Sequence, residues 1–466
     1  MMADGSNNNH DNNKATTTTT KTTTATSAFP NLGVSLAFLI SFVESPDLDK
    51  PMYQLARPAL TQQDLDAMDN VSLRQLAKEL RVHHHLHLPR SEELTLYDDV
   101  TTPAQEWRDA VSRLPTTTAE VGFSLIKPRT QGIGECYADA IVRPSHPDWV
   151  GKPTDFLCHA WQYNFKNFVS ALQCEAEERD HHRQEQGLQP IAHERFYWND
   201  IFVENQNFRD KPENYFQNAF QEAIHSIGRT VLILMPLKDP VPLTRAWCVW
   251  EMFCSIAGEK VELAIALPPS ERVELEQMLR EEFDEIINIL TNVHVETSEA
   301  SHVSDRDMIH RIVREQCEGG FNGVNSVICE GLRGWLSSTA LRLVSGVVEG
   351  EEVVEELDSM NQVGGMLMEQ GRLEEAEVMF RRGLAGRERV SGVDHPETLT
   401  SVNNLGLLLQ DQGKLEEAEV LFRRALEGRE RVLGVDHPDT LTSVNNLGSL
   451  LKEQGKLEEA EVLYRR

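Results

Sequence analysis

Two kinds of polar pair recur near the carboxyl end of the chain, at a spacing of 42 residues. The asparagine pairs are Asn403 with Asn404 and Asn445 with Asn446, and the arginine pairs are Arg423 with Arg424 and Arg465 with Arg466. An asparagine pair can hydrogen-bond both the amide and the carbonyl of a peptide backbone, because each side chain carries donors and an acceptor. Guanidinium groups can hold acidic side chains or a carboxylate. These residues are therefore candidates for binding an extended peptide.

The same pairs have a second interpretation that involves no partner. Asparagines can cap or solvate the start of a helix. The arginines can pair with the Glu-Glu run that precedes them on the same helix. The sequence alone leaves both interpretations open.

A sequence repeat positions these pairs. Gly371, Gly413 and Gly455 each close a turn and stand just before Leu-Glu-Glu-Ala-Glu-Val. Apolar and small residues at spacings of three and four predict two antiparallel helices in each copy. The small Gly406 and Ala418 would let the two helix backbones approach each other. A period of this length predicts an all-α solenoid.

Residues 358–466 resemble tetratricopeptide repeats, and Asp394-His395-Pro396 followed by Asn-Asn-Leu-Gly resembles the longer repeats of kinesin light chains. The resemblance implies that the first helices line a groove that receives a protein or peptide partner. The sequence ends at Arg466, inside the second helix of the third copy. We therefore expect further repeats in the complete protein.

The rest of the chain contains one run of potential metal ligands and no nucleotide-binding loop. The run His83, His84, His85 and His87 has ligand chemistry, but no Cys, Asp or Glu at matching spacing completes a site, so a solvated run is expected. The seven cysteines lie in the middle of the chain without metal-ligand spacing, which favours a reducing compartment. No phosphate-binding Gly-x-x-x-x-Gly-Lys loop occurs. The sequence thus predicts no metal site and no required cofactor.

Short apolar runs alternate with helical stretches from Thr154 onward. The predicted strands are 155–158, 195–203, 230–235, 261–267 and a short one at 293–296. The predicted helices are 162–180, 213–227, 243–257 and 270–290. This alternation predicts an α/β, flavodoxin-like parallel sheet, in which ligands lie beyond the carboxyl ends of the strands.

Two segments of this region carry a resemblance to a known family. Phe156-Leu-Cys-His-Ala-Trp161 and Leu243-Thr-Arg-Ala-Trp-Cys-Val-Trp-Glu-Met252 resemble the first strand and a later helix of Toll/interleukin-receptor-like (TIR-like) domains, over about residues 154–318. The preceding segment resembles the leader of algal and protist proteins that join such a domain to repeats. The resemblance implies that residues 28–153 form a helical leader that packs on the domain.

The resemblance also implies candidate catalytic residues. Glu251 matches the glutamate that cleaves nicotinamide from NAD in catalytic members, where a carboxylate stabilises an oxocarbenium-like ribose. His159 could aid proton transfer, and Trp161 or Trp198 could stack on a ring of NAD. The loop after the second strand lacks the glycines of catalytic members. The alternative is that Trp247, Cys248 and Trp250 fill the core and Glu251 pairs with a basic neighbour.

Net charge, hydropathy and local composition predict which partners the chain can bind and where its segments begin and end. The formal charge of −29 argues against nucleic acid and anionic membranes as partners. The apolar run from Gly33 to Val43 is too short to span a bilayer, so a buried helix is expected. Residues 1–27 read as an Asn/Thr-rich disordered tail, and 319–357 as a helical connector with an acidic linker. We expect a cytoplasmic signalling scaffold that also associates through its TIR-like domain, or alternatively an NAD glycohydrolase switched on by clustering.

Overall fold

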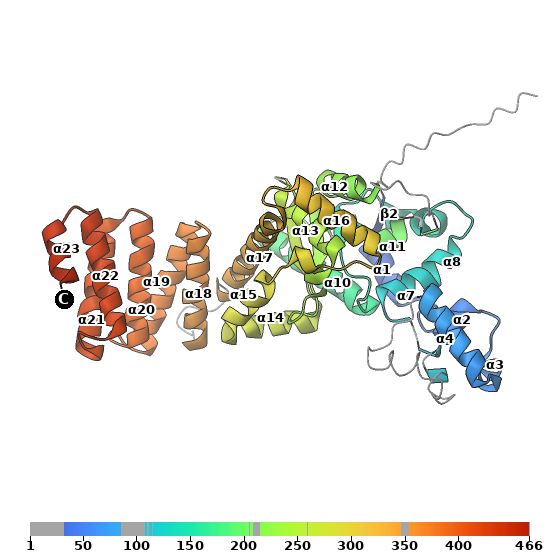
Figure 1. The fold of residues 1–466 in the computed structure, drawn as a ribbon, viewed down its shortest axis with the longest axis horizontal. Helices are drawn as coiled ribbons and strands as arrows, with labels where there is room; N and C mark the ends of the chain where they lie inside the picture. Colours follow the sequence, from blue (N-terminus) through green and yellow to red (C-terminus); the bar gives the residue numbers. More distant parts are fainter. Residues whose placement is uncertain are drawn as a thin grey trace, which may run out of the picture.

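The computed structural model describes residues 32–84, 108–109, 111–113, 115–204, 206–207, 215–258, 260–345 and 354–465. Within these ranges, the chain forms an α/β body followed by a row of antiparallel helices (Figure 1). The predicted tail of residues 1–27 lies outside them, as do His85 and His87. The exposed His83 lies near the end of a helix.

One mixed sheet forms the centre of the α/β body. Its strands are β1 (Gly33–Ser35), β2 (Val150–Gly151), β3 (Asp155–Cys158), β4 (Phe196–Trp198), β5 (Arg229–Ile233) and β6 (Glu262–Ala266). Their order is β2-β1-β4-β3-β5-β6. The strands β4, β3, β5 and β6 are parallel, whereas β1 runs antiparallel to both β2 and β4. The prediction of a wholly parallel sheet is therefore wrong at this edge.

The antiparallel edge comes from the segment predicted as a helical leader. The apolar run Gly33–Val43 divides into strand β1 and helix α1 (Leu36–Val43), because the Ser35 side chain accepts a hydrogen bond from the Phe38 amide and begins the helix. An added Cβ at Gly33 would lie 3.0 Å from the backbone of Phe196, so glycine allows the two strands to pair closely. The leader thus contributes strands as well as helices.

Two other strand predictions need correction. Residues 195–203 were expected to form one strand, but β4 ends at Trp198 and helix α11 (Asp200–Val203) follows. The Asn199 side chain accepts a hydrogen bond from the Ile201 amide and so caps this helix. The predicted fifth strand at 293–296 is replaced by the 3-10 turn η6 (Val295–Thr297).

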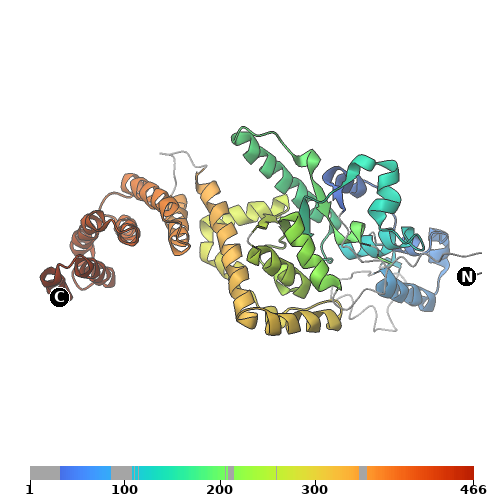
Figure 2. The ribbon, with the colours of Figure 1, turned by 90° about the horizontal axis from the view of Figure 1, so that it is seen from above.

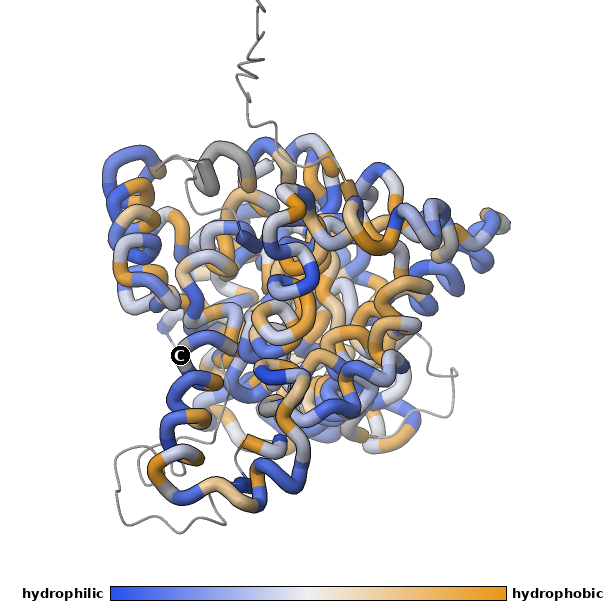
Figure 3. Tube along the Cα trace, turned by 90° about the vertical axis from the view of Figure 1, so that its right-hand side faces the viewer, coloured by the Kyte–Doolittle hydropathy of each residue, from blue (hydrophilic) through white to orange (hydrophobic). Residues whose placement is uncertain are grey.

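Helices cover both faces of the sheet. Helix α10 (Phe165–Glu185) packs on β5 and β6, and α12 (Tyr215–Ile227) with α13 (Ala246–Ala257) covers the other face, as right-handed crossovers require. The predicted helix 270–290 is two helices, α14 (Pro269–Glu281) and α15 (Phe283–Thr291). Seen along the long axis, hydrophobic stretches concentrate near the middle of the molecule (Figure 3).

Short helical segments make up the rest of the leader and the loops. They are α2 (Met52–Ala56), α3 (Gln62–Ala67), α4 (Asn70–His84), α7 (Thr118–Val121), α8 (Lys127–Arg129), α9 (Arg143–Ser145), the π-helices η1 (Gly122–Ile126) and η2 (Ala138–Val142), and the 3-10 turns η3 (Pro147–Trp149), η4 (Ala192–Glu194) and η5 (Val241–Thr244). Apolar side chains of α1, η1 and η2 belong to the same buried cluster as the sheet. The leader therefore shares the core of the α/β body.

Helices continue from the α/β body to the carboxyl end. They are α16 (Val303–Gln316), α17 (Gly320–Ser345), α18 (Val354–Glu369), α19 (Leu373–Val390), α20 (Pro396–Asp411), α21 (Leu415–Leu433), α22 (Pro438–Glu453) and α23 (Leu457–Tyr464). The pairs α18/α19, α20/α21 and α22/α23 are the three predicted copies. They follow one another away from the α/β body (Figure 2).

Two features of the repeat sequence explain this packing. A Cβ at Gly406 would lie 2.7 Å from the Phe422 ring, so glycine lets α20 and α21 meet where the phenylalanine fills the gap. The side chains of His395 and His437 accept hydrogen bonds from the amides of Glu397 and Asp439 and cap α20 and α22. The histidines before Pro396 and Pro438 therefore satisfy free amides at the starts of these helices.

Helix α17 connects the two regions. It packs on α13, α15 and α16 of the α/β body and on α18 of the first repeat. The Ser359 hydroxyl of α18 also donates to the Leu279 carbonyl of α14, at 3.1 Å. Over the described residues, no helix combines the length and the apolar character that crossing a membrane requires.

Candidate functional site

The carboxyl edge of the parallel strands gathers the chemistry-bearing residues of the α/β body. Strand β3 ends at Cys158, and His159 follows it directly. Asp200 begins α11 just beyond the end of β4. Because β3 and β4 are parallel neighbours, their carboxyl ends meet. Helix α13 crosses the same region and supplies Cys248 and Glu251.

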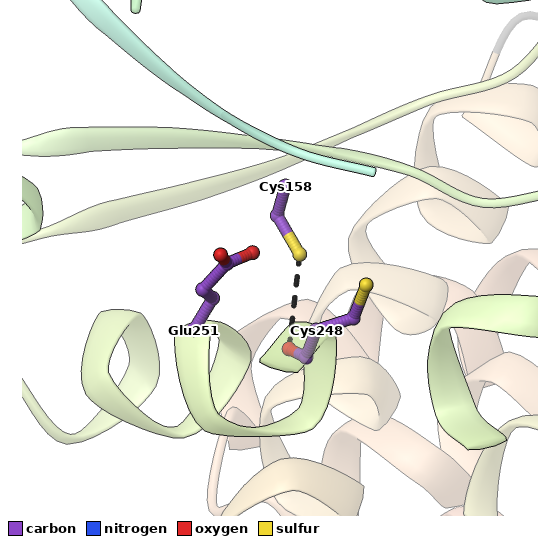
Figure 4. A group of neighbouring side chains, drawn as sticks. All are labelled: Cys158, Cys248 and Glu251. Carbon is purple, nitrogen blue, oxygen red and sulfur yellow. Dashed lines mark hydrogen bonds between the residues drawn. The ribbon is translucent and has the colours of Figure 1, made fainter. Parts of the chain in front are cut away.

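Cys158, Cys248 and Glu251 point into one space between β3 and α13 (Figure 4). One ligand atom from each, a sulfur or a carboxylate oxygen, lies within 4.8 Å of the other two. The Cys158 thiol donates to the Cys248 carbonyl at 3.7 Å, and the Cys248 thiol donates to the His159 carbonyl at 3.5 Å. Glu251 is only 7% exposed. This cluster is part of the core.

Burial determines the protonation of the cluster. It raises the pKa of the Glu251 carboxyl well above its usual range, and the nearby Cys248 raises that pKa further. Burial likewise raises the pKa of the Cys158 thiol well above its usual range. The neutral forms of both groups are therefore favoured unless a cation compensates their charge.

His159 and Asp200 form a second pair at this edge. The Nε2 atom of His159 lies 3.9 Å from Oδ1 of Asp200, beyond hydrogen-bond distance, and both atoms are buried without a hydrogen-bond partner in the part of the chain that the structure describes. The other oxygen of Asp200 accepts a hydrogen bond from Trp161 Nε1 at 2.8 Å. Burial lowers the pKa of His159, which favours its neutral form.

Asp200 was missed by sequence reasoning. The residue fell inside a predicted strand, although an Asn-Asp pair after an aromatic run is a recognisable helix start. The position of Asp200 just after a strand could have identified it, because polar residues just beyond parallel strands commonly lie at a ligand site.

The two candidate stacking tryptophans have different surroundings. Trp198 is 1% exposed, and its ring stacks on Phe156 with centroids 4.9 Å apart and planes 3° apart. Trp161 is partly exposed and packs edge-on against Phe123 of the leader at 5.6 Å. Stacking of NAD on Trp198 would require the core to open, whereas Trp161 lies nearer the surface.

The asparagines of the repeats also differ in how exposed their side chains are. Asn403 is buried, and its oxygen accepts a hydrogen bond from Asn446 Nδ2 of the next repeat at 3.0 Å. Asn404 is half-buried and Asn445 is exposed. The hydrogen bond between Asn403 and Asn446 therefore connects neighbouring first helices. Asn445 occupies the place of Asn403 one repeat later, where no described repeat follows to cover it, so Asn404 is the more informative candidate for contact with a partner.

The arginines pair with glutamates, as the alternative interpretation expects. Arg423 contacts Glu419 at 2.8 Å and Glu459 of the next repeat at 2.9 Å, and Arg424 contacts Glu388 of the preceding repeat at 2.5 Å. Most of these partners lie in another repeat rather than on the same helix. A hollow of about 340 Å³ on this side is lined by Asp394, Val420, Arg423, Arg424, Glu427, Gly428 and Arg431.

Comparisons with known proteins bear on the repeat region. The family model of the tetratricopeptide repeat matches residues 355–430 and again 400–466. Residues 355–466 are tetratricopeptide repeats. Comparison with curated protein sequences finds no match.

Two proteins of known structure resemble part of the chain. The nearly identical TPR-like repeats of a Podosopora anserina chain named after kinesin light chains share 19% identity, over 42% of this chain and 92% of that chain, with a TM-score of 0.29. BtubC (BKLC) from P. vanneervenii shares 20% identity over 42% of this chain and 84% of that chain, with a TM-score of 0.27.

Proposed function

We propose that the protein is a cytoplasmic scaffold of signalling assemblies, in which the tetratricopeptide repeats bind a protein or peptide partner and the α/β body, as a TIR-like domain, mediates assembly. The match of residues 355–466 to the tetratricopeptide family carries the proposal, because such repeats generally bind protein partners. The half-buried Asn404 can hydrogen-bond an extended chain. The hollow on the second helices is lined by arginines and by Asp394 and Glu427, so an acidic side chain of a partner would bind there by replacing the present glutamate partners of Arg423 and Arg424.

Peptide selection tests the binding role. A displayed random peptide library is selected against the full chain, and the Kd of each enriched peptide is measured by fluorescence anisotropy. The variant Asn404→Ala should weaken binding by about tenfold or more. This variant leaves intact the hydrogen bond between Asn403 and Asn446.

A control separates loss of contact from loss of fold. Lys166→Ala changes an exposed residue of α10 in the α/β body and should leave every Kd unchanged. Arg423→Ala with Arg424→Ala should selectively weaken acidic peptides. If the selected peptides bind the asparagine variant as tightly as they bind the native chain, the groove assignment is wrong.

The NAD glycohydrolase is the alternative function. Its support is the placement of Glu251, His159 and Asp200 at the carboxyl edge of the parallel strands, where ligands of such folds lie. Glu251 is buried beside two thiols, so cleavage would require the site to open on clustering. Self-association of the TIR-like domain would provide that clustering.

Nicotinamide release tests this alternative. The full chain, concentrated or clustered on an antibody, is incubated with NAD, and nicotinamide is measured by chromatography. Catalysis through Glu251 predicts release that the Glu251→Gln variant abolishes. Absence of release from the clustered chain, or equal release by the variant, excludes Glu251 as the catalytic carboxylate.

A further inference from the structure

Three groups with metal-binding chemistry converge between β3 and α13. Cys248 and Glu251 lie three residues apart on one face of α13, and Cys158 faces them from the end of β3 (Figure 4). Their ligand atoms lie within 4.8 Å of one another, and all three residues are buried. Sequence spacing did not reveal this cluster, because the sheet brings together positions 90 residues apart.

The donor set distinguishes between metals. Two thiols and one carboxyl are ligands of zinc, whereas magnesium and calcium take oxygen ligands only. Zinc bonds of about 2.3 Å to sulfur and about 2.0–2.2 Å to oxygen place tetrahedral ligand atoms roughly 3.5–3.8 Å apart. The three ligand atoms, now within 4.8 Å of one another, would therefore need to approach by up to about 1.3 Å.

A second, independent observation lies at the same strand edge. His159 directly follows Cys158, and its buried Nε2 has no hydrogen-bond partner within the described ranges. Oδ1 of Asp200, 3.9 Å away, is unsatisfied in the same way. Buried polar atoms of this kind commonly mark the place of a water or an ion. The His159 ring packs against Phe168 of α10, so these atoms lie beside the cluster at the strand edge rather than among its ligands. Zinc with three protein ligands holds a water in its fourth position.

We propose that Cys158, Cys248 and Glu251 bind one zinc ion. Binding replaces three S–H or O–H bonds with three metal–ligand bonds and releases three protons to solvent, with no change of oxidation state. The resulting centre carries one net negative charge, as a site of three cysteines and one histidine does. The ion would fasten α13 to β3 and so stabilise the α/β body.

Metal loading of the full chain tests the proposal. The purified chain is stripped with a chelator under reducing conditions and reloaded with Zn²⁺ alone or Co²⁺ alone. Metal content is measured by mass spectrometry, and the thiolate-to-cobalt absorption reports sulfur ligands. We expect about one metal per chain, a melting temperature that rises on loading, and cobalt absorption that Cys158→Ser and Cys248→Ser each reduce.

Two further variants keep the result interpretable. Glu251→Gln preserves the volume and the neutral state of the buried side chain, so it should fold, and it should weaken metal binding by about tenfold or more. Cys174→Ser removes a half-buried thiol of α10 outside the cluster and should change nothing. A folded native chain that takes up no metal overturns the proposal. The proposal is also overturned if Cys174→Ser loses as much metal as Cys158→Ser or Cys248→Ser, because this would indicate that the metal binds to thiols in general.

Discussion

At the scale of single residues, a buried arginine stabilises the edge of the sheet that lies opposite the candidate site. Arg229, at the start of β5, forms ion pairs with Asp155 of β3, Glu175 of α10 and Glu262 of β6. Asp155 and Glu175 are both buried. Asp155 also contacts Arg179 at 3.4 Å, and Glu175 also contacts Arg195 at 3.2 Å. Arg229 is the guanidinium that both carboxylates share, so this network fixes the amino-terminal ends of three strands, while their carboxyl ends remain available to the candidate site.

Loss of this arginine should destabilise the α/β body strongly. Arg229→Met leaves buried carboxylates without their main partner, and we expect the free energy of unfolding to fall by about 3–5 kcal/mol. Urea denaturation followed by circular dichroism measures the change. Arg272→Met is the matched control, because its ion pair with Glu178 is largely exposed and is worth less than about 1 kcal/mol. Equal effects of the two variants would contradict the structural role of Arg229.

Neighbouring glycines in the first repeat have opposite surroundings. An added Cβ at Gly364 would lie 2.9 Å from the Phe380 ring, whereas nothing lies within 4 Å of one at Gly365. Gly364→Ala should therefore destabilise the repeats by about 1–3 kcal/mol through overpacking. Gly365→Ala should be neutral or stabilise by up to about 1 kcal/mol through higher helix propensity. Denaturation curves of the two variants check this difference; if Gly364→Ala proves harmless, the close approach of α18 and α19 is wrong.

The residues of the candidate site differ in how far sequence could place them. His159 and Glu251 were singled out by a resemblance to TIR-like domains and not by spacing alone, and the structure puts both near the carboxyl edge of the parallel strands. The pairing of Arg424 with Glu388 depends on how repeats stack, which spacing within one helix cannot show. Burial of Trp198 depends on Phe156 and Phe220, which come from distant parts of the chain.

At the scale of elements, ion pairs recur between successive repeats. Lys414, just before α21, contacts Glu377 of α19 at 2.8 Å, and Lys456 contacts Glu419 in the equivalent place at 2.6 Å. These hydrogen bonds lower the pKa of Glu377 to about 2 and lower that of Glu419. The pairs add stability to each junction of the solenoid.

This pairing predicts how stability depends on pH. Because the pKa of Glu377 in the folded state lies below its ordinary value of 4.5, its contribution is complete above that value and is lost as pH falls toward 2. The shift alone would correspond to about 3 kcal/mol, but Lys414 is 43% exposed and solvent screens the pair, so we expect about 1 kcal/mol.

Urea denaturation of the native chain and Glu377→Gln at several pH values measures this contribution. The native chain should be more stable near pH 6, and the two curves should converge near pH 2. Asp411→Asn, at an exposed position of α20, should stay within about 0.5 kcal/mol of the native chain throughout. A difference between Glu377→Gln and the native chain that is independent of pH would rule out the ion pair as its cause.

Strongly periodic elements were the most predictable part of the fold. The repeat helices and strands β3, β5 and β6 follow from apolar spacing, and the structure places them within a few residues of the predicted bounds. Strand β1 was missed because a short apolar run has the same appearance whether it is strand or helix. The strand expected at Val293–Glu296 failed for the same reason, since a few apolar residues can equally form a buried 3-10 turn.

At the scale of the whole molecule, the repeats join the α/β body through a packed junction. Ser337 of α17 donates to Gln370 at 2.8 Å, and Arg372 donates to Ser338 at 3.1 Å. The buried Ser359 binds the Leu279 carbonyl of α14. Helix α17 also packs on α13, which carries Glu251, so packing contacts run from the repeats to the candidate site.

A bulky side chain at this junction should separate the two regions. Ser359→Trp cannot fit the small space that Leu279, Ala340 and Val363 line, so α18 should move away from α14. We expect a larger radius of gyration in small-angle X-ray scattering and separate melting transitions of the two regions. Gln362→Trp, at an exposed position of the same helix, should leave both measurements unchanged. If Ser359→Trp keeps the native scattering profile and one joint transition, the junction does not depend on the packing of α18 against α14.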